Sequence, residues 1–215
     1  MSCGWKHRGP LGPRAFVLWA LASLCGLLLA CAPPFRVPTQ VRIPEESPRG
    51  EVETSDLAIR ATALVDEEAQ LELFRANLLL AGLLPVYLEM RNRGDVPVQL
   101  HRVRVEAYDE SGNRLLLRSP KQALRHLFDY YDVTAYRITS REQLERSFAE
   151  MAFAFTPALA PDETRRGMLF LALAGEPGPR HAPARLTLTF ASLRRARAPE
   201  TFSLTLHIIM QRAEQ

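Results

Sequence analysis

Apolar and polar residues alternate along several segments of the chain. The clearest alternation covers residues 202–208, and the same pattern marks residues 186–190, 86–90 and, more weakly, 57–65. Alternation with period two is typical of β-strands that bury one face. Residues 167–173 are apolar on both faces, which indicates a central strand.

The alternation changes phase between residues 98 and 108. The apolar residues Leu100 and Val103 fall on opposite parities, and a shift by one residue would turn the core side chains towards solvent. We therefore predict a β-bulge near His101 and Arg102. Turns are expected on either side of this region, at residues 92–95 and 109–113.

Three segments are expected to be helical. Ser119 and Pro120 suit the N-cap and first position of a short helix. A second helix begins at Thr139 or Ser140, each followed three residues later by Glu or Gln, as in a capping box. The third and weakest covers residues 66–77.

These elements predict a mainly β (α+β) fold. Six to eight strands, few helices and no βαβ rhythm favour an immunoglobulin-like β-sandwich with a short helical insertion at about residues 119–150. The domain is expected to span residues 51–215, a length that suits one hydrophobic core.

A family resemblance supports the same fold. Residues 84–100 (LPVYLEMRNRGDVPVQL), followed by a strand and a turn at 109–112, resemble the opening of LEA14/WHy-type immunoglobulin-like sandwiches. In that family an apolar strand, an asparagine and a turn precede a second strand and a glycine turn. Residues 119–150 depart from the pattern. The resemblance implies a non-catalytic domain.

The N-terminal residues 1–30 have the pattern of a secretory signal. Lys6, Arg8 and Arg14 precede an uncharged apolar run at residues 15–30, which is the order of the two regions of a signal peptide. The run is short for a membrane-spanning helix, which needs about 20 apolar residues. We expect it to be removed.

The run ends in Leu28-Leu29-Ala30-Cys31, which resembles the lipobox of bacterial lipoproteins. In that family signal peptidase II cleaves between the residues that are Ala30 and Cys31 here, and the cysteine carries acyl chains such as palmitate. The resemblance implies lipid attachment at Cys31. Two alternatives stay open: Cys31 is an ordinary cysteine beyond another cleavage site, or the apolar run is an uncleaved anchor.

The same resemblance implies a location. Ala32 follows the cysteine, and in lipoproteins of two-membrane bacteria a residue other than aspartate there implies release towards the outer membrane. We expect a cell-envelope protein on the outer membrane, facing the periplasm. Residues 31–50 would form an extended tether, with prolines at Pro33, Pro34, Pro38, Pro44 and Pro48.

Cysteine usage and charge exclude several classes of protein. Cys3 and Cys25 lie within the signal, so the mature chain keeps Cys31 alone, and no internal disulfide or thiol nucleophile follows. The chain has 27 Lys and Arg and 24 Asp and Glu, and loss of the three Lys and Arg residues of the signal leaves 24 of each sign. Net charge therefore predicts no nucleic-acid partner.

The sequence lacks the common catalytic, nucleotide-binding and metal-binding motifs. We therefore expect no enzymatic activity, no catalytic residue, no cofactor and no metal. His126, Asp129 and Asp132 are the cluster that a hydrolase of unrecognised type would use. The histidines of the mature chain lack the spacing of metal ligands: His101, His126, His181 and His207.

Two segments are candidate interaction surfaces. Residues 128–132 combine carboxylates with aromatic rings, as in sugar and peptide sites, although such a run also suits a helix end folded onto the sheet. The basic cluster at 194–197 would contact anionic lipid headgroups or form a solvated turn. The candidate residues are Phe128, Asp129, Tyr130, Tyr131, Asp132, Arg194, Arg195 and Arg197.

Arg93-Gly94-Asp95 matches the integrin-binding tripeptide. It also matches a tight turn, in which Gly94 would adopt a positive φ and Asp95 would form a local side-chain bond. The second interpretation is preferred, because three residues carry little information.

Three functions remain open. The preferred one is a non-enzymatic binding or scaffold lipoprotein, with an envelope protein or lipid as its partner. A lipid-handling or transport-accessory protein is the first alternative and requires an apolar cavity. A hydrolase is the second and requires converging side chains of His126, Asp129 and Asp132.

Overall fold

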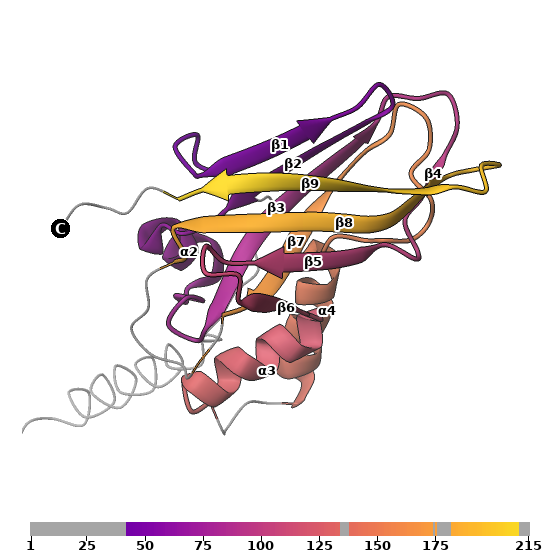
Figure 1. Cartoon of the computed structure of the whole chain (residues 1–215). Coiled ribbons are helices and arrows are strands. Elements are labelled where there is room, and N and C mark those ends of the chain that lie inside the picture. Colours follow the sequence, from indigo (N-terminus) through magenta and orange to yellow (C-terminus); the bar gives the residue numbers. More distant parts are fainter. Residues whose placement is uncertain (1–41, 134–137, 174, 176–181, 211–215) are drawn as a thin grey trace, which may run out of the picture. The chain divides into compact units, whose positions relative to one another are not determined.

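The computed structural model describes residues 42–133, 138–173, 175 and 182–210, except for the side chains of residues 138–140. The predicted signal, Cys31 and the first part of the tether lie outside the described residues. The described part contains nine strands and three helices (Figure 1). Within it, no helix is both long and apolar enough to cross a membrane.

The described part of the chain contains the following elements. The helices are α2 (Glu67–Phe74), α3 (Pro120–Tyr130) and α4 (Ile138–Met151). The strands are β1 (Arg49–Glu53), β2 (Leu57–Ala63), β3 (Leu83–Asn92), β4 (Val98–Gln99), β5 (Arg104–Tyr108), β6 (Arg114–Arg118), β7 (Thr164–Ala172), β8 (Arg185–Arg195) and β9 (Thr201–Ile209).

The strands form one antiparallel sheet that nearly closes on itself. Its order is β1-β2-β3-β7-β6-β5-β8, with β9 on the other side of β8 and β4 paired with the far end of β8. At the seam between the first and last strands, a Cβ atom on Gly50 of β1 would lie 2.2 Å from the carbonyl oxygen of His207 of β9. The two strands therefore touch.

This architecture confirms the prediction of a mainly β fold with few helices. The immunoglobulin-like sandwich is not confirmed, because β6 pairs with both β5 and β7 and so joins the strands into a single barrel-like sheet. The prediction of six to eight strands missed β1 and β6.

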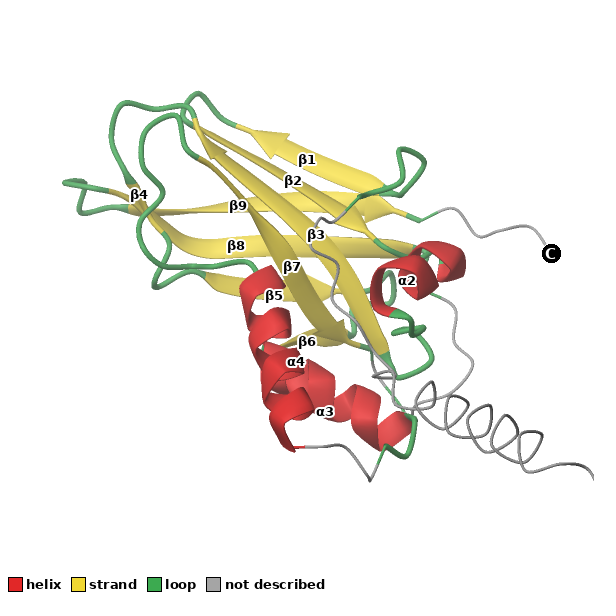
Figure 2. Cartoon of the chain, turned by 180° about the vertical axis from the view of Figure 1, so that it is seen from behind, coloured by secondary structure: helices red, strands yellow, loops and turns green. Residues whose placement is uncertain are grey.

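Strands β3 and β7 are buried on both faces because two cores share them as a wall. Leu88 of β3 and Leu169 of β7 belong to the core inside the curved sheet. The neighbouring Met168 and Phe170 of β7 belong to a second core, formed with α2, α3 and α4 on the outer face. Figure 2 shows these helices gathered on that side. The predicted double-sided burial of residues 167–173 is confirmed as far as Ala172.

Helices α2 and α3 each begin after a residue that caps the N-terminus. Asp66 accepts a hydrogen bond from the backbone N–H of Ala69 at 2.7 Å and caps α2. Ser119 and Gln122 form a reciprocal capping box at the start of α3, which confirms the predicted N-cap. Helix α4 begins at Ile138, and the capping boxes predicted there depend on side chains outside the described residues.

Where the sequence pattern changes phase, the structure has an interruption in each of two paired segments, β4–β5 and β8. Between β4 and β5 the backbone N–H of Val103 donates to the carbonyl of Leu100 at 2.9 Å and forms a turn. Opposite, β8 shifts register between Phe190 and Leu193, and Ser192 adopts a left-handed φ of 65°. The irregularity lies where it was predicted, but it is larger than a one-residue bulge.

The fold begins before residue 51. The carbonyl of Pro48 accepts a hydrogen bond from the N–H of Ala63 at 2.9 Å, and β1 starts at Arg49. Residues 48–50, predicted to belong to the tether, therefore form part of the sheet.

Candidate functional site

The segment 128–132 is buried only in part: Phe128 packs among the helices, whereas Asp129, Tyr131 and Asp132 are exposed. Phe128 is buried in the outer core, and the guanidinium of Arg141 from α4 lies 5.1 Å from its ring centre. The Tyr131 hydroxyl accepts from the N–H of Asn77 and donates to the carbonyl of the same residue, both at 3.2 Å. Burial raises the pKa of Tyr131. The ring of Tyr130 meets that of Tyr131 edge-on at 4.9 Å.

The cluster expected for a hydrolase is only partly assembled. His126 and Asp129 lie one turn apart on α3, whereas Asp132 follows the end of the helix in a left-handed conformation with φ 49°. Burial lowers the pKa of His126, the positive charge of Arg118 lowers it further, and Asp129 opposes both. The first two effects favour a neutral imidazole.

Arg93-Gly94-Asp95 lies in the bend between β3 and β4. The guanidinium of Arg93 holds the carboxylate of Glu53 through two hydrogen bonds of 2.9 and 3.0 Å. The predicted positive φ at Gly94 is wrong. Glycine is favoured there by a close approach instead, because a Cβ atom would lie 3.1 Å from Cβ of Asp56.

The three arginines of the basic cluster have different surroundings. Arg194 donates from Nε to Oε1 of Gln99 at 2.9 Å. Arg195 lies 2.6 Å from the carboxylate of Asp56 and 5.1 Å from the ring centre of Phe202. Arg197 is exposed in the turn before β9. The three side chains therefore lie in different environments, and Arg194 alone among them lines a described pocket.

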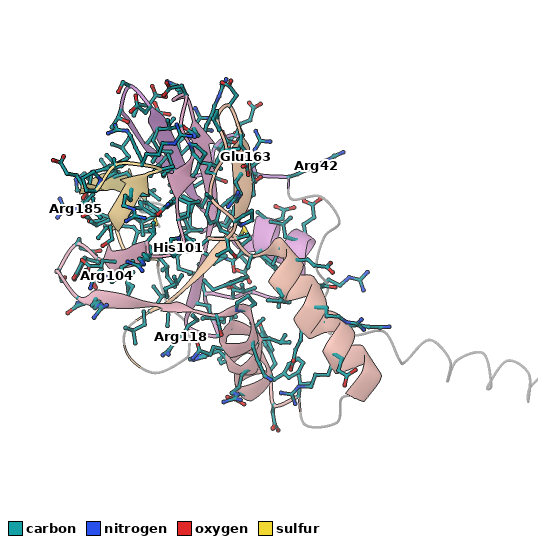
Figure 3. The ribbon with its side chains drawn as sticks, turned by 90° about the vertical axis from the view of Figure 1, so that its right-hand side faces the viewer. Arg42, His101, Arg104, Arg118, Glu163 and Arg185 are labelled. Carbon is teal, nitrogen blue, oxygen red and sulfur yellow. The ribbon has the colours of Figure 1, made fainter. Side chains whose placement is uncertain are left out.

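That pocket, of about 320 Å³, opens where the breaks in β4–β5 and β8 face each other. We call it the arginine pocket. Figure 3 shows two of its residues, His101 and Arg104, near one another. Two other lining residues were singled out in the sequence for different reasons: Arg102 for the predicted bulge and Arg194 for the basic cluster. No sequence pattern indicated that they would lie in one pocket. The lining residues are Gln99, His101, Arg102, Arg104, Ser192, Arg194 and Thr201.

A second pocket, of about 620 Å³, lies between the start of α3 and the middle of α4. Charges of both signs line it, including Lys121, Glu145 and Arg146. Lys121 and Glu145 lie 3.9 Å apart. Neither pocket is the apolar cavity that a lipid-handling function requires.

The histidines do not form a metal site within the described part. No group of three or more His, Cys, Asp or Glu side chains there could hold a metal ion. His207 lies on the exposed face of β9, with Nδ1 3.1 Å from Oγ1 of Thr187. Cys31 and His181 lie outside the described residues.

Comparisons with known proteins give no family for the chain. No family model matches it, and no curated protein matches it. Among solved structures, it is similar to a crystal structure of a DUF4426 family protein from Pseudomonas aeruginosa PAO1. The identity is 12%, the match covers 75% of this chain and 95% of the other, and the TM-score is 0.29. A likeness at that TM-score carries no argument about fold or function.

Proposed function

We propose that this protein is a bacterial lipoprotein of the cell envelope whose β-rich domain binds a partner without catalysing a reaction. The observation that carries the proposal is the position of Cys31, directly after the small Ala30 at the end of an apolar run that follows basic residues. Acyl chains on Cys31 would hold the domain at the membrane, because each buried methylene contributes about 0.8 kcal/mol.

A binding function is supported by the roles of the polar side chains. Arg93 and Tyr131, which belonged to candidate motifs, form structural contacts. The arginine pocket, in contrast, is lined in part by exposed side chains with donor groups, among them Arg102, Arg104 and Thr201. Its lining includes no carboxylate that would act as a general base beside His101 or Ser192.

The immunoglobulin-like sandwich is the finer part of the proposal. Its support is the inner core, where Leu88 of β3 and Leu188 of β8 come from opposite halves of the sheet and belong to the same cluster. If the fold is related to a sandwich, β6 is the strand that passes from the half with β3 and β7 to the half with β5 and β8. Regular hydrogen-bonded pairing between β1 and β9, as detected by cross-strand NMR contacts, would contradict it.

The lipid anchor is tested by intact-mass measurement of the protein isolated from a bacterial envelope. We expect the mature chain to begin at Cys31 and to carry diacylglycerol and acyl mass. Cys31→Ser should abolish both cleavage at this site and the added mass. Cys25→Ser is the matched control, because Cys25 lies inside the signal and its loss should leave the mature mass unchanged. A wild-type chain that begins elsewhere would reject the anchor.

The expected location is tested by membrane fractionation. The wild-type protein should occur with the outer membrane, and Ala32→Asp should retain it in the inner membrane. Recovery of the wild type in the inner membrane would contradict the proposed sorting and leave the anchor itself untouched.

A further inference from the structure

The arginine pocket is a product of the tertiary fold. Strand β8 pairs with β4 through Arg194, with β5 through Ala191 and with β9 on its other side. The turn at residues 100–103 and the register shift at Ser192 interrupt the neighbouring strands at the same level. Breaks of this kind are frequent next to functional sites because they redirect side chains out of the regular pleat. A left-handed serine is also strained and needs support from its surroundings.

Within the described residues, the arginines of this pocket form no ion pair. Elsewhere on the sheet arginines face carboxylates, as Arg165 does with Glu163 and Arg195 with Asp56. In the residues that the structure describes, no carboxylate lies within ion-pair distance of Arg102 or Arg104. The mature chain as a whole is balanced in charge, so this excess is local.

One guanidinium in the pocket is held in a fixed position. Arg194 donates from both Nε and Nη2 to the side-chain oxygen of Gln99, and these two bonds leave its Nη1 hydrogens for another acceptor. The amide nitrogen of Gln99 and the hydroxyls of Ser192 and Thr201 are further donors in the same lining. The pocket therefore offers many donors to an acceptor-rich ligand.

We propose that the arginine pocket binds a phosphate group. Guanidinium groups bind phosphate oxygens through paired, charge-assisted hydrogen bonds, and three guanidiniums with neutral donors suit a tetrahedral anion better than a planar carboxylate. The phosphate belongs either to a small soluble molecule or to a lipid headgroup. The inference rests on the proposed binding function and does not depend on the lipid anchor.

Calorimetric titration of the full-length protein in a nonionic detergent tests the pocket. The probes are inorganic phosphate and glycerophosphoglycerol, the deacylated headgroup of phosphatidylglycerol, at constant ionic strength. We expect saturable binding of at least one probe. Phosphate alone would identify a soluble ligand or a phosphate monoester, whereas binding of the diester would identify a phospholipid headgroup. If neither binds, or if chloride at equal ionic strength competes equally well, the proposal is overturned.

Substitutions locate the binding. Arg104→Gln and Arg102→Gln should each weaken binding by about tenfold, as expected when one charge-assisted hydrogen bond to an anion is lost. Both side chains are exposed, so the variants should fold, and their melting curves verify this. Arg185→Gln is the matched control, since Arg185 begins the same strand β8, roughly 30 Å from Arg194 at the rise of an extended strand.

The control should bind as the wild type does. Equal weakening by Arg185→Gln would show a diffuse charge effect and overturn the pocket assignment. The two proposals fail separately, because an unacylated mature chain rejects the anchor without affecting phosphate binding, and loss of phosphate binding leaves the mass of the mature chain unchanged.

Discussion

The Nη2 atom of Arg165 lies 2.7 Å from Oε1 of Glu163, and this pair fastens the loop between α4 and β7 to the sheet. The same guanidinium donates from Nη1 to the carbonyls of Ala154 and Pro157 at 3.0 and 2.6 Å, and from Nη2 to that of Ala158 at 3.1 Å. One side chain, 11% exposed, thus satisfies a carboxylate and three backbone carbonyls. This network organises the loop.

Arg165→Lys should destabilise the domain although it keeps the charge. A single ammonium cannot reach carbonyls on several sides at once, and the loss of bonds to a charged donor predicts a decrease of about 1.5–3 kcal/mol in the free energy of unfolding. Arg166→Lys is the control, because Arg166 is 56% exposed and pairs with Glu89 at the surface, so its change should stay within about 1 kcal/mol. Urea unfolding measures both.

Glu163 should make the free energy of unfolding depend on pH in the acidic range. Its pKa is held below the ordinary value of 4.5, first because its carboxylate accepts the N–H of Ala160 at 2.8 Å, and also because Arg165 donates to it; burial opposes these effects. A carboxyl whose folded pKa is depressed stabilises the fold above its unfolded pKa, and this contribution is lost as pH falls through the folded pKa.

Glu163→Gln should therefore be less stable than the wild type at neutral pH, with a difference that shrinks as the pH falls below about 4.5. Urea unfolding at a series of pH values measures it. A difference that stayed constant into strong acid would show that the carboxylate charge has no part in stability.

Asn92 should not tolerate aspartate. Its buried amide nitrogen donates to the carbonyls of Val96 at 2.9 Å and Leu159 at 3.1 Å, so a carboxylate would set a negative oxygen against two acceptors. We expect Asn92→Asp to lower stability by about 3 kcal/mol or more. Asn77→Asp should cost less, because Asn77 accepts from the N–H of Leu80 and a carboxylate keeps that role. Equal losses in thermal unfolding would contradict this account.

Gly167→Ala should also destabilise the fold. The chain at Phe153 crosses β7 so closely that an added Cβ would lie 2.5 Å from its N and Cα atoms, and a clash with backbone forces the strand and the loop apart. We expect a loss of about 3 kcal/mol, as for an overpacked core. Gly94→Ala, with its nearest contact at 3.1 Å, should lose less than Gly167→Ala. The reverse order would show that the loop moves freely.

The strands with regular patterns were predictable from sequence. In β9, Leu204, Leu206 and Ile208 are buried while Thr205 and His207 are exposed, which follows their alternation. The strand is paired on one side and faces the core with one face, so local pattern and tertiary environment agree.

Strands β1 and β6 were missed for physical reasons. In β6 three consecutive leucines do not alternate, and Leu116 and Leu117 are 45% and 38% exposed. Strand β1 is short and follows a proline-rich stretch, and its pairing partner β2 supplies most of the apolar residues. Neither segment carries a periodic signal of its own.

The arginine pocket was beyond sequence reasoning as a site. Its residues come from three stretches, near 99–104, 192–194 and 201, which meet because β8 pairs with strands on both sides. The phase change at His101 and Arg102 marked one of these stretches, but no local pattern indicates that Arg194 faces it. Such a convergence depends on strand order, which the sequence pattern did not specify.

The contact between β1 and β9 limits how a partner can associate with the sheet. An added strand needs about 4.8 Å of separation from each neighbour, whereas a Cβ on Gly50 would already lie 2.2 Å from the oxygen of His207. Beside Gly50, an extended peptide therefore has no room to insert between the two strands by strand addition, a common route to both peptide recognition and edge-to-edge aggregation. A partner that binds at this position must therefore contact side chains and loops and not the strand backbone.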